Sequence, residues 1–535
     1  MRKFMRIGLV ALAALGLTVS VTACGGGGSS SSSSGSGKSL VADTVFDLKT
    51  LDPARSFEFT SVSLDHQIYQ TALNYAGNGN TLNKVVPGLA SYTLSSDAKT
   101  VTLKMKGTNY FSDGAKVTAD DVAFSYERLI GIAGNPAFLL EDPNGDPIKV
   151  SQPDKSTVVL TSGVANPSLP FILPNPSLGI VEKKVVLKHG GTTDPNDQAG
   201  NWLTTHSAGS GPYVVKSADV KSQVKLAANP HYAGTKPAYS NVVVQNVTSA
   251  TQKVNIQAGT SQMAFDLSAD DAKSLNSGKT RVVTGQSTYT LYAWFNAQEK
   301  YGKEASNVKF VQAMRHAIDY SAIVKYMGSG SVQPGGVVPL MFGGSLKSDP
   351  TNSYDPAKAK QLLAESGYNG EEIDFLVSSD GTVGGVSIQS LGEQVQAQVK
   401  KLGVNLVLKP MPSVTALDTF RSGTFQAGLT DWGADYPDPA DYIAFGPDQN
   451  VGKRAAWATG AGISSAERLK PMFTKAMTTA DPSDRFKAWQ DVQKEMNVDS
   501  PFIPVAQPGD RMVYSSSLSN VKLNPIWNVD FSQVK

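Results

Sequence analysis

A short segment rich in turn residues, 433–439, carries two carboxylates that could anchor a positively charged ligand. They are Asp435 and Asp438, and Trp432 and Tyr436 flank the first of them. In a dry cleft a carboxylate holds an ammonium group by a charge-assisted hydrogen bond, and aromatic rings supply walls. An aspartate here could instead cap a following helix, and the rings could belong to the core. We expect a ligand role for Asp435 and a structural role for Asp438, and leave both roles open for the rings.

The elements before this segment predict its position in the fold. Hydrophobic patterning predicts strands at 373–378, 404–409 and 425–432, with helices at 387–402 and 414–421 between them. A β-α-β-α-β order predicts a parallel, doubly wound sheet. Ligands of such sheets bind beyond the carboxyl ends of the strands, and Asp435 follows the third strand directly.

The rest of the chain also alternates between the two periodicities. We expect helices over 61–75, after Thr118, after Asn307 and from Asp481. We expect strands at 40–51, 100–106, 157–161, 241–247 and 289–295, and a hairpin over 213–227. No internal repeat is visible.

The single cysteine, Cys24, follows a basic start and an apolar run over residues 7–21. This pattern is typical of a secretory signal, and the run is shorter than the roughly 20 residues of a membrane-spanning helix. Val21-Thr-Ala-Cys24 resembles a lipobox, which implies cleavage after residue 23 and a lipid anchor on Cys24 in the bacterial cell membrane. Residues 24–39 then form a Gly/Ser tether with a reach of about 20 Å.

Composition excludes several classes of protein. The chain has 535 residues, a net charge of +2, 40% hydrophobic and 18% charged residues. It is long enough for two or more ordered domains, and its charge gives no general attraction to nucleic acid. One cysteine and five scattered histidines do not predict a metal site, and no cofactor-binding loop is present, so we expect neither a metal nor a cofactor.

An ordered set of short segments resembles the extracytoplasmic solute-binding proteins of dipeptide/oligopeptide-type ABC importers (bacterial solute-binding protein family 5). The matching segments are Leu51-Asp-Pro53, Pro87-Gly-Leu-Ala90, Phe111-Ser-Asp-Gly114, Thr118-Ala-Asp-Asp-Val-Ala-Phe-Ser125, Gly209-Ser-Gly-Pro-Tyr213, Asn229-Pro-His-Tyr232, Arg315-His-Ala-Ile-Asp319, Tyr354-Asp-Pro-Ala-Lys-Ala359 and Trp432-Gly-Ala-Asp-Tyr-Pro-Asp-Pro439.

The resemblance implies an α/β fold with two lobes, a hinge of two crossing strands, and a periplasmic-binding-protein-like architecture. Lobe I would comprise 40–287, with an extra subdomain at about 85–220, and the return segment 505–535. Lobe II would comprise 288–504. The lobes would close on a small solute, with a peptide as the expected ligand, and the protein would deliver it to ABC permease subunits in the membrane. We expect a monomer.

The resemblance also implies site residues. Asp435 matches the aspartate that pairs with the α-ammonium of peptide ligands, with Trp432 and Tyr436 beside it. Phe57, Glu58 and Phe59 match a stretch that lines the opposite side of the cleft. Some relatives carry an arginine just before the tryptophan, where this chain has Leu429. Relatives also bind sugars and metal chelates, so an oligosaccharide or a chelate stays open as the ligand.

Catalysis is the competing class of function. No Gly-x-Ser-x-Gly elbow occurs, and His206 beside Ser207 forms no triad in sequence. The carboxylate pairs Asp120-Asp121 and Asp270-Asp271 suit the first turns of helices. We therefore predict no catalytic residues and no enzyme, with a secreted hydrolase as the alternative and a sensor or adhesion lipoprotein as a further one.

Overall fold

The computed structural model describes residues 38–77, 81–460 and 464–535. The expected signal segment, the lipid anchor at Cys24 and nearly all of the tether lie outside these ranges. Among the described residues, no helix has both the length and the apolar character needed to cross a membrane.

A seven-stranded sheet forms one part of the molecule, here called lobe I. Its strand order is β12-β20-β11-β1-β10-β9-β8. Its strands are β1 (Ser39–Thr44), β8 (Tyr213–Asp219), β9 (Gln223–Ala228), β10 (Asn241–Asn246), β11 (Met263–Ala264), β12 (Thr280–Gln286) and β20 (Gly509–Ser515). Both chain ends of the described body therefore meet in one sheet, since β1 and β20 both pair with β11.

A five-stranded sheet forms lobe II, in the order β17-β14-β18-β13-β19. Its strands are β13 (Tyr289–Phe295), β14 (Glu372–Ser378), β17 (Asn405–Met411), β18 (Ala427–Gly433) and β19 (Phe502–Ala506). Strand β14, second in this order, pairs in parallel with both β17 and β18. Helices α11 (Ile388–Lys400) and α12 (Ser413–Arg421) connect these strands, which confirms the predicted β-α-β-α-β unit.

A smaller four-stranded sheet, here called the subdomain sheet, is formed by strands between Ala90 and Thr161. It has the order β4-β5-β7-β6, with β4 (Ala90–Leu94), β5 (Thr100–Met105), β6 (Lys149–Asp154) and β7 (Thr157–Thr161). Helix α2 (Ala119–Ile132) begins as predicted after Thr118. The Thr118 hydroxyl accepts from Asp121 N–H while the Asp121 carboxylate accepts from Thr118 N–H, and this capping box fixes the start of the helix.

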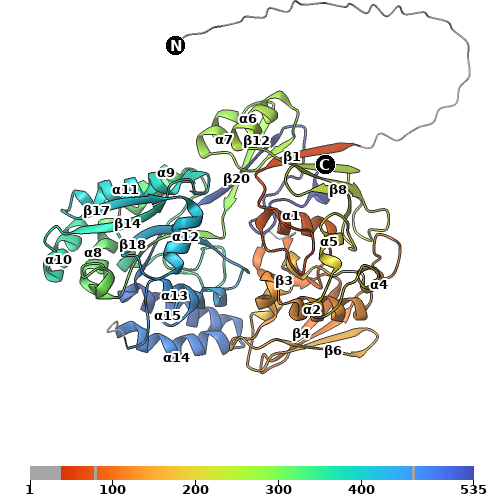
Figure 1. The fold of residues 1–535 in the computed structure, drawn as a ribbon, viewed down its shortest axis with the longest axis horizontal. Coiled ribbons are helices and arrows are strands. Elements are labelled where there is room, and N and C mark those ends of the chain that lie inside the picture. Colours follow the sequence, from red (N-terminus) through yellow and green to blue (C-terminus); the bar gives the residue numbers. More distant parts are fainter. Residues whose placement is uncertain (1–37, 78–80, 461–463) are drawn as a thin grey trace, which may run out of the picture. The chain divides into compact units, whose positions relative to one another are not determined.

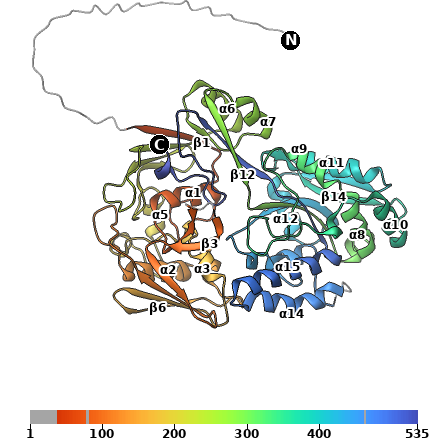
Figure 2. The ribbon, with the colours of Figure 1, turned by 180° about the vertical axis from the view of Figure 1, so that it is seen from behind.

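The chain changes sheets twice. Strand β12 ends at Gln286 in lobe I and β13 begins at Tyr289 in lobe II, while β19 and β20 make the return. The two passages are tied together, because Ser287 N–H donates to the Pro508 carbonyl at 3.1 Å and Gln507 Nε2 donates to the Ser287 carbonyl at 2.6 Å. Figure 1 shows the two lobes and Figure 2 shows β12 leading from one toward the other. The limits predicted for lobe I (40–287 and 505–535) and for lobe II (288–504) remain a prediction. The positions of these two passages support them.

The remaining helices surround the sheets. They include α1 (Phe59–Ile68), α6 (Ser249–Ala258), α7 (Ala269–Leu275), α8 (Val308–Ala317), α9 (Tyr320–Met327), α10 (Pro356–Ser366), α13 (Asn450–Arg454), α14 (Ser464–Thr478) and α15 (Pro482–Asp499). Asn307 caps α8 and Asp481 caps α15, as the sequence predicts.

Two predictions near the amino terminus are wrong in part. The strand expected over 40–51 ends at Thr44, and the helix expected over 61–75 begins earlier, at Phe59, and is replaced by β2 (Leu73–Ala76) at its end. Asp47 accounts for the early start of α1. Its carboxylate accepts the N–H groups of Phe59 and Thr60, so the chain after β1 turns away from the sheet to cap α1.

Candidate ligand-binding site

The segment predicted to bind ligand lies at the carboxyl end of β18. Asp435 follows the strand by two residues, and its backbone is held on both sides. Its N–H donates to the Asp441 carboxylate at 2.7 Å, and its carbonyl accepts from Asn175 Nδ2 at 3.0 Å. Asn175 belongs to the segment after the subdomain sheet, so Asp435 lies where lobe II meets the other half of the molecule.

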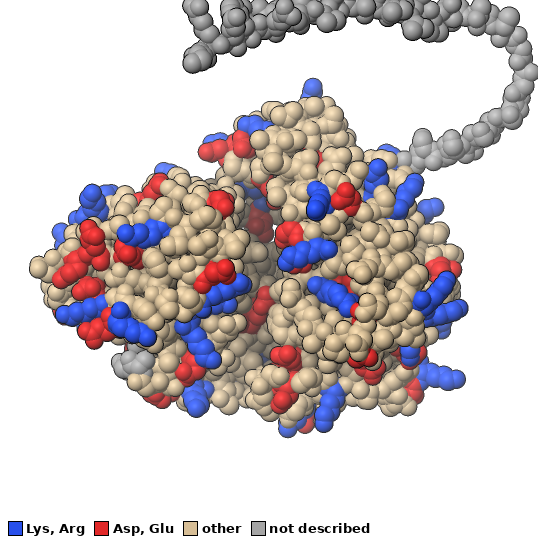
Figure 3. Space-filling view, viewed as in Figure 1, with Lys and Arg blue, Asp and Glu red and all other residues tan. Residues whose placement is uncertain are grey.

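A cavity of about 440 Å³ opens at this meeting point. Lobe II contributes Trp432, Asp435, Tyr436, Ala440, Asp441, Ile443, Ala444, Gln449, Asn450, Val451, Arg454 and Met477, and the opposite wall consists of Phe138, Glu141, Asp142, Pro143, Asn166, Ser168 and Ile172. Figure 3 shows acidic side chains in the hollow between the two halves. We call this space the interlobe cavity.

Asp435 and Asp441 form a carboxylate pair in this cavity without an ion-pair partner among the described residues. Burial raises the pKa of Asp435 to about 7, and Arg454 partly opposes the shift. Burial also raises the pKa of Asp441 well above its ordinary value, and the neighbouring Asp435 charge adds to that. Two buried carboxylates with too little positive charge nearby favour a shared proton or an added cation.

Asp438 behaves differently although it is only three residues away. Its side chain accepts from Ala440 N–H at 2.9 Å and so caps the short 3-10 helix η6 (Pro439–Phe445). It also forms a buried ion pair with both terminal nitrogens of Arg485 of α15, and Arg485 Nη2 donates in addition to Ser168 Oγ at 3.0 Å. The structural interpretation of Asp438 is therefore the one that the geometry supports.

Trp432 and Tyr436 both line the interlobe cavity. Trp432 also packs edge-to-face on Tyr442 and Phe445, with ring centroids 5.0 and 5.3 Å apart. The ring is thus held by the core of lobe II while one side remains at the cavity. The surroundings of Trp432 therefore combine the two alternatives that the sequence left open, a wall of the pocket and a residue of the core.

Phe57, Glu58 and Phe59 do not line the interlobe cavity. Phe57 packs edge-to-face on Phe138, a cavity residue, at 5.4 Å between ring centroids. Glu58 pairs with Lys49, and Phe59 is the first residue of α1 with 37% of its surface exposed. The structure thus brings Phe57 to the rim of the cavity and places the other two away from it.

Sequence reasoning missed four charged residues that line the cavity, Glu141, Asp142, Asp441 and Arg454. The search for a cation looked just before Trp432, where Leu429 lies in the core of lobe II with 2% exposure. The structure supplies the cation from α13 instead, 22 positions after Trp432. The only available signal was an arginine in a short helical segment beyond the motif, which is not distinctive in sequence.

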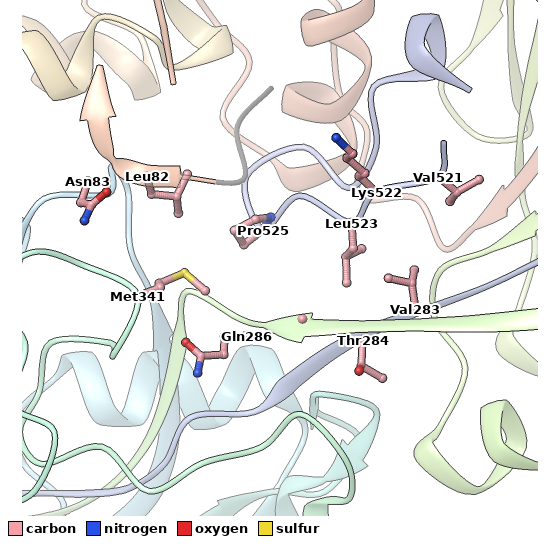
Figure 4. A pocket seen from close by; sticks show the side chains of 11 residues that line it. Leu82, Asn83, Val283, Thr284, Gln286, Met341, Val521, Lys522, Leu523 and Pro525 are labelled. Carbon is pink, nitrogen blue, oxygen red and sulfur yellow. The ribbon is translucent and has the colours of Figure 1, made fainter. Parts of the chain in front are cut away.

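A second cavity, of about 540 Å³, lies beside the crossing strand β12. Figure 4 shows Leu82, Met341 and Leu523 around it, above Thr284 and Gln286 of the strand. Lys522 is its only charged lining residue, so it does not gather carboxylates as the interlobe cavity does.

The residues that the sequence analysis considered for catalysis lie in a ring stack or in the first turns of helices. His206 is exposed, and its ring stacks on Trp202 at 4.7 Å. Asp120-Asp121 and Asp270-Asp271 lie in the first turns of α2 and α7, as predicted. Within the described ranges, no group of three His, Cys, Asp or Glu side chains is arranged to hold a metal ion.

Comparison with known proteins identifies the family. Residues 84–450 match the model of bacterial extracellular solute-binding proteins, family 5 Middle. The chain belongs to this family. Among curated relatives of this solute-binding family, the chain is 25% identical over 494 residues to the probable D,D-dipeptide-binding periplasmic protein DdpA of Escherichia coli, covering 91% of this chain and 92% of that protein.

Two further comparisons show the breadth of the solute-binding family. The chain is 25% identical to heme-binding protein A of Haemophilus influenzae, over 85% of this chain and 84% of the relative. The crystal structure of the ABC transporter substrate-binding protein CtaP from Listeria monocytogenes superimposes with a TM-score of 0.80 at 19% identity, covering 93% of this chain and 99% of that one. This likeness shows the two-lobed fold, and all three relatives are named as binding proteins.

Proposed function

We propose that this solute-binding protein captures a peptide with a free amino terminus in the interlobe cavity and delivers it to the permease of an ABC importer. The observation that carries the proposal is the pair formed by the partly buried Asp435 and the buried Asp441, which has no ion-pair partner among the described residues and lines a cavity between the two halves. A bound ammonium group would supply the missing positive charge.

The cavity also carries a charge for the other end of a peptide. Arg454 lines the same space as Asp435, and burial lowers the pKa of its guanidinium. A planar guanidinium binds a carboxylate through two parallel hydrogen bonds, so an amine anchor and a carboxylate anchor lie in one cavity. The name of the DdpA relative, a D,D-dipeptide-binding protein, fits a ligand of this kind.

We infer that the ligand drives closure of the two lobes. The walls of the cavity come from both halves, while the described chain crosses between the two large sheets at the paired passages 287–288 and 507–508. A ligand that contacts both walls stabilises the arrangement in which they are close, and the two passages absorb the motion. In this role Trp432 and Tyr436 form the apolar wall, with Phe57 behind Phe138 on the other side.

The heme-binding relative makes another solute the second candidate. A heme-sized or oligosaccharide ligand would not require the Asp435–Asp441 pair to be ionised. We favour the peptide because its ammonium group would compensate two carboxylates that have no ion-pair partner among the described residues.

We further propose that Cys24 carries the lipid anchor that holds the protein at the outer face of the cell membrane. Two or more acyl chains give stable membrane binding, whereas one gives only reversible binding. Replacing Cys24 with serine should release the protein from the membrane fraction or leave the signal uncleaved, which immunoblotting of fractions and intact mass determine. Normal retention of the Cys24→Ser protein in membranes would overturn the anchor.

The function is tested by incubating the purified chain, without residues 1–23, with a mixed pool of short peptides. Bound material is recovered after gel filtration, released by denaturation and analysed by mass spectrometry. We expect intact peptides with free amino termini. Peptide fragments would indicate a hydrolase, and recovery of no peptide together with tight binding of added heme would favour the second candidate.

A further inference from the structure

A separate cavity of about 300 Å³ lies in lobe II at the carboxyl ends of its parallel strands. We call it the lobe II pocket. Its walls are mostly apolar and come from β13, β14, β18, the start of α11, one face of α12 and the segment 381–382. The lining residues are Trp294, Leu376, Ser378, Gly381, Thr382, Ile388, Ser413, Ala416, Leu417, Phe420, Leu429, Thr430 and Asp431.

Asp431 is the only charged residue among those that line the lobe II pocket. It is partly buried, and no described cation forms an ion pair with it. Burial raises its pKa to about 6, opposed only by its own backbone N–H. A carboxylate held in an apolar pocket without a counter-ion is unfavourable in the empty protein and gains from a cation that enters.

The two serines of the pocket lining already have partners within the protein. The hydroxyls of Ser378 and Ser413 contact each other at 2.9 Å, and Asp380, outside the pocket lining, accepts from Ser413 N–H at 2.7 Å. The start of α12 therefore has its anion from within the protein, and an external anion is not required there. Asp431 remains as the group whose charge is not matched.

The lobe II pocket is a neighbour of the interlobe cavity. Asp431 precedes Trp432, which lines the interlobe cavity. The Arg454 guanidinium of that cavity lies 5.5 Å from the ring centroid of Phe420, which lines the lobe II pocket. Asp431 and Asp435 also both act on Tyr289, whose pKa is raised first by burial and then by these and other carboxylates. The contact between Arg454 and Phe420 therefore places the lobe II pocket beside the cavity that contains Asp435.

We propose that the lobe II pocket receives a lysine or arginine side chain of the bound peptide, with its methylene stem along the apolar walls and its cationic head at Asp431. This inference rests on the proposed peptide-binding function and adds the class of peptide. Long cationic side chains pack their stems on apolar surface while their charged heads reach a polar partner. An apolar side chain of the same length would fill the walls but leave Asp431 without a counter-ion.

The test uses tripeptides with free termini and alanine at two of the three positions. The variable position carries lysine, arginine, norleucine or glutamine, and is placed first, second or third. Norleucine has the stem of lysine without its charge. Calorimetry measures each peptide against the wild-type chain, Asp431→Asn, Asp435→Asn and the control Asp418→Asn, which removes an exposed carboxylate from α12 outside the pocket.

At one position, lysine and arginine peptides should bind the wild-type chain about tenfold or more tightly than norleucine peptides. Asp431→Asn should bring this ratio close to one, Asp418→Asn should leave it unchanged, and Asp435→Asn should weaken all peptides while preserving the ratio. The proposal is overturned if the wild-type chain shows no preference for cations, or if Asp431→Asn retains it.

The experiment distinguishes failure of the proposed peptide-binding function from failure of the lobe II pocket proposal. Tight binding of peptides without a cation preference overturns only the lobe II pocket. Failure of every peptide to bind overturns the peptide function and this inference together. Thermal unfolding controls for folding, and Asp431→Asn should be at least as stable as wild type at pH 8, because it removes a carboxylate whose ionisation burial disfavours.

Discussion

Two pairs of neighbouring aspartates, one fully buried and the other partly exposed at Asp435, differ in whether a cation compensates their charge. In lobe I, Asp52 and Asp197 share Arg128, which donates to Asp52 at 2.7 Å and to Asp197 at 2.8 Å. Arg55 adds contacts to both, at 2.7 and 2.9 Å. In lobe II, Asp435 and Asp441 have no ion pair of this kind among the described residues.

The titration of the two pairs reflects this difference. Burial alone would raise the pKa of Asp197, but the hydrogen bonds and charge of Arg128 lower it below its ordinary value. Burial raises the pKa of Asp435 to about 7, because Arg454 only partly compensates. The ion-paired aspartates stabilise the fold, and we propose that the pair without a cation partner binds the positive charge of a ligand.

The largest expected effect comes from removing the internal cation. Arg128→Met should lower the free energy of unfolding by about 3–5 kcal/mol, because two buried carboxylates lose their principal partner. Denaturant unfolding measures the change. The matched control Arg468→Met breaks a largely exposed pair with Glu495 and should cost no more than about 1 kcal/mol. Equal losses in the two variants would contradict the comparison.

Arg454→Gln tests the positive side of the interlobe cavity. We expect peptides with a free carboxyl terminus to lose about 1.5–3 kcal/mol of binding free energy, since a charge-assisted hydrogen bond is removed. Peptides with an amidated carboxyl terminus should be affected little. Calorimetry decides, with Arg421→Gln as the control because Arg421 is exposed and lies outside the cavity lining. Similar losses for both classes of peptide would assign Arg454 to packing.

The smallest effect is a pH dependence of binding. With a pKa of about 7 in the empty protein, the Asp435 carboxyl is mostly protonated at pH 6. A bound ammonium favours the ionised form and lowers this pKa, so binding releases a proton and the affinity rises from pH 5.5 to 7.5. The limit is tenfold per pH unit for one proton.

Calorimetry in two buffers of different ionisation enthalpy counts this proton. We expect release of up to one proton at pH 6 and less at pH 7.5, with Asp435→Asn reducing the release. A flat affinity across this range, with no proton exchange, would show that Asp435 does not change its charge state on binding.

Local signals in the sequence predicted much of lobe II. Strand β14 ends at Ser378 as expected, and α11 spans Ile388–Lys400 within the predicted 387–402. These elements depend on periodicity over a few residues and on short connections, both of which are visible in the sequence. The position of Asp435 followed from the same order of elements.

The opposite wall of the cavity could not be predicted in this way. Asn175 meets Asp435 across 260 positions of sequence, and α1 is capped by Asp47, twelve residues before its start. Contacts of this kind result from the tertiary arrangement, so local rules placed Phe59 in a loop. The role of Asp52 in the Leu51-Asp-Pro53 segment likewise depends on its ion pair with Arg128 of α2, which local rules do not predict.

The central claim is that Asp435 binds the α-ammonium of a peptide, and a double-mutant cycle tests it most directly. Calorimetry compares a peptide recovered from the pool with its N-acetylated form, on the wild-type chain and on Asp435→Asn. For the free peptide, Asp435→Asn should cost about 2–5 kcal/mol of binding, or about 30-fold to several thousand-fold in affinity. The N-acetylated peptide should bind the wild-type chain weakly and be changed little by the substitution. Equal losses for the free and acetylated peptides would contradict the claim.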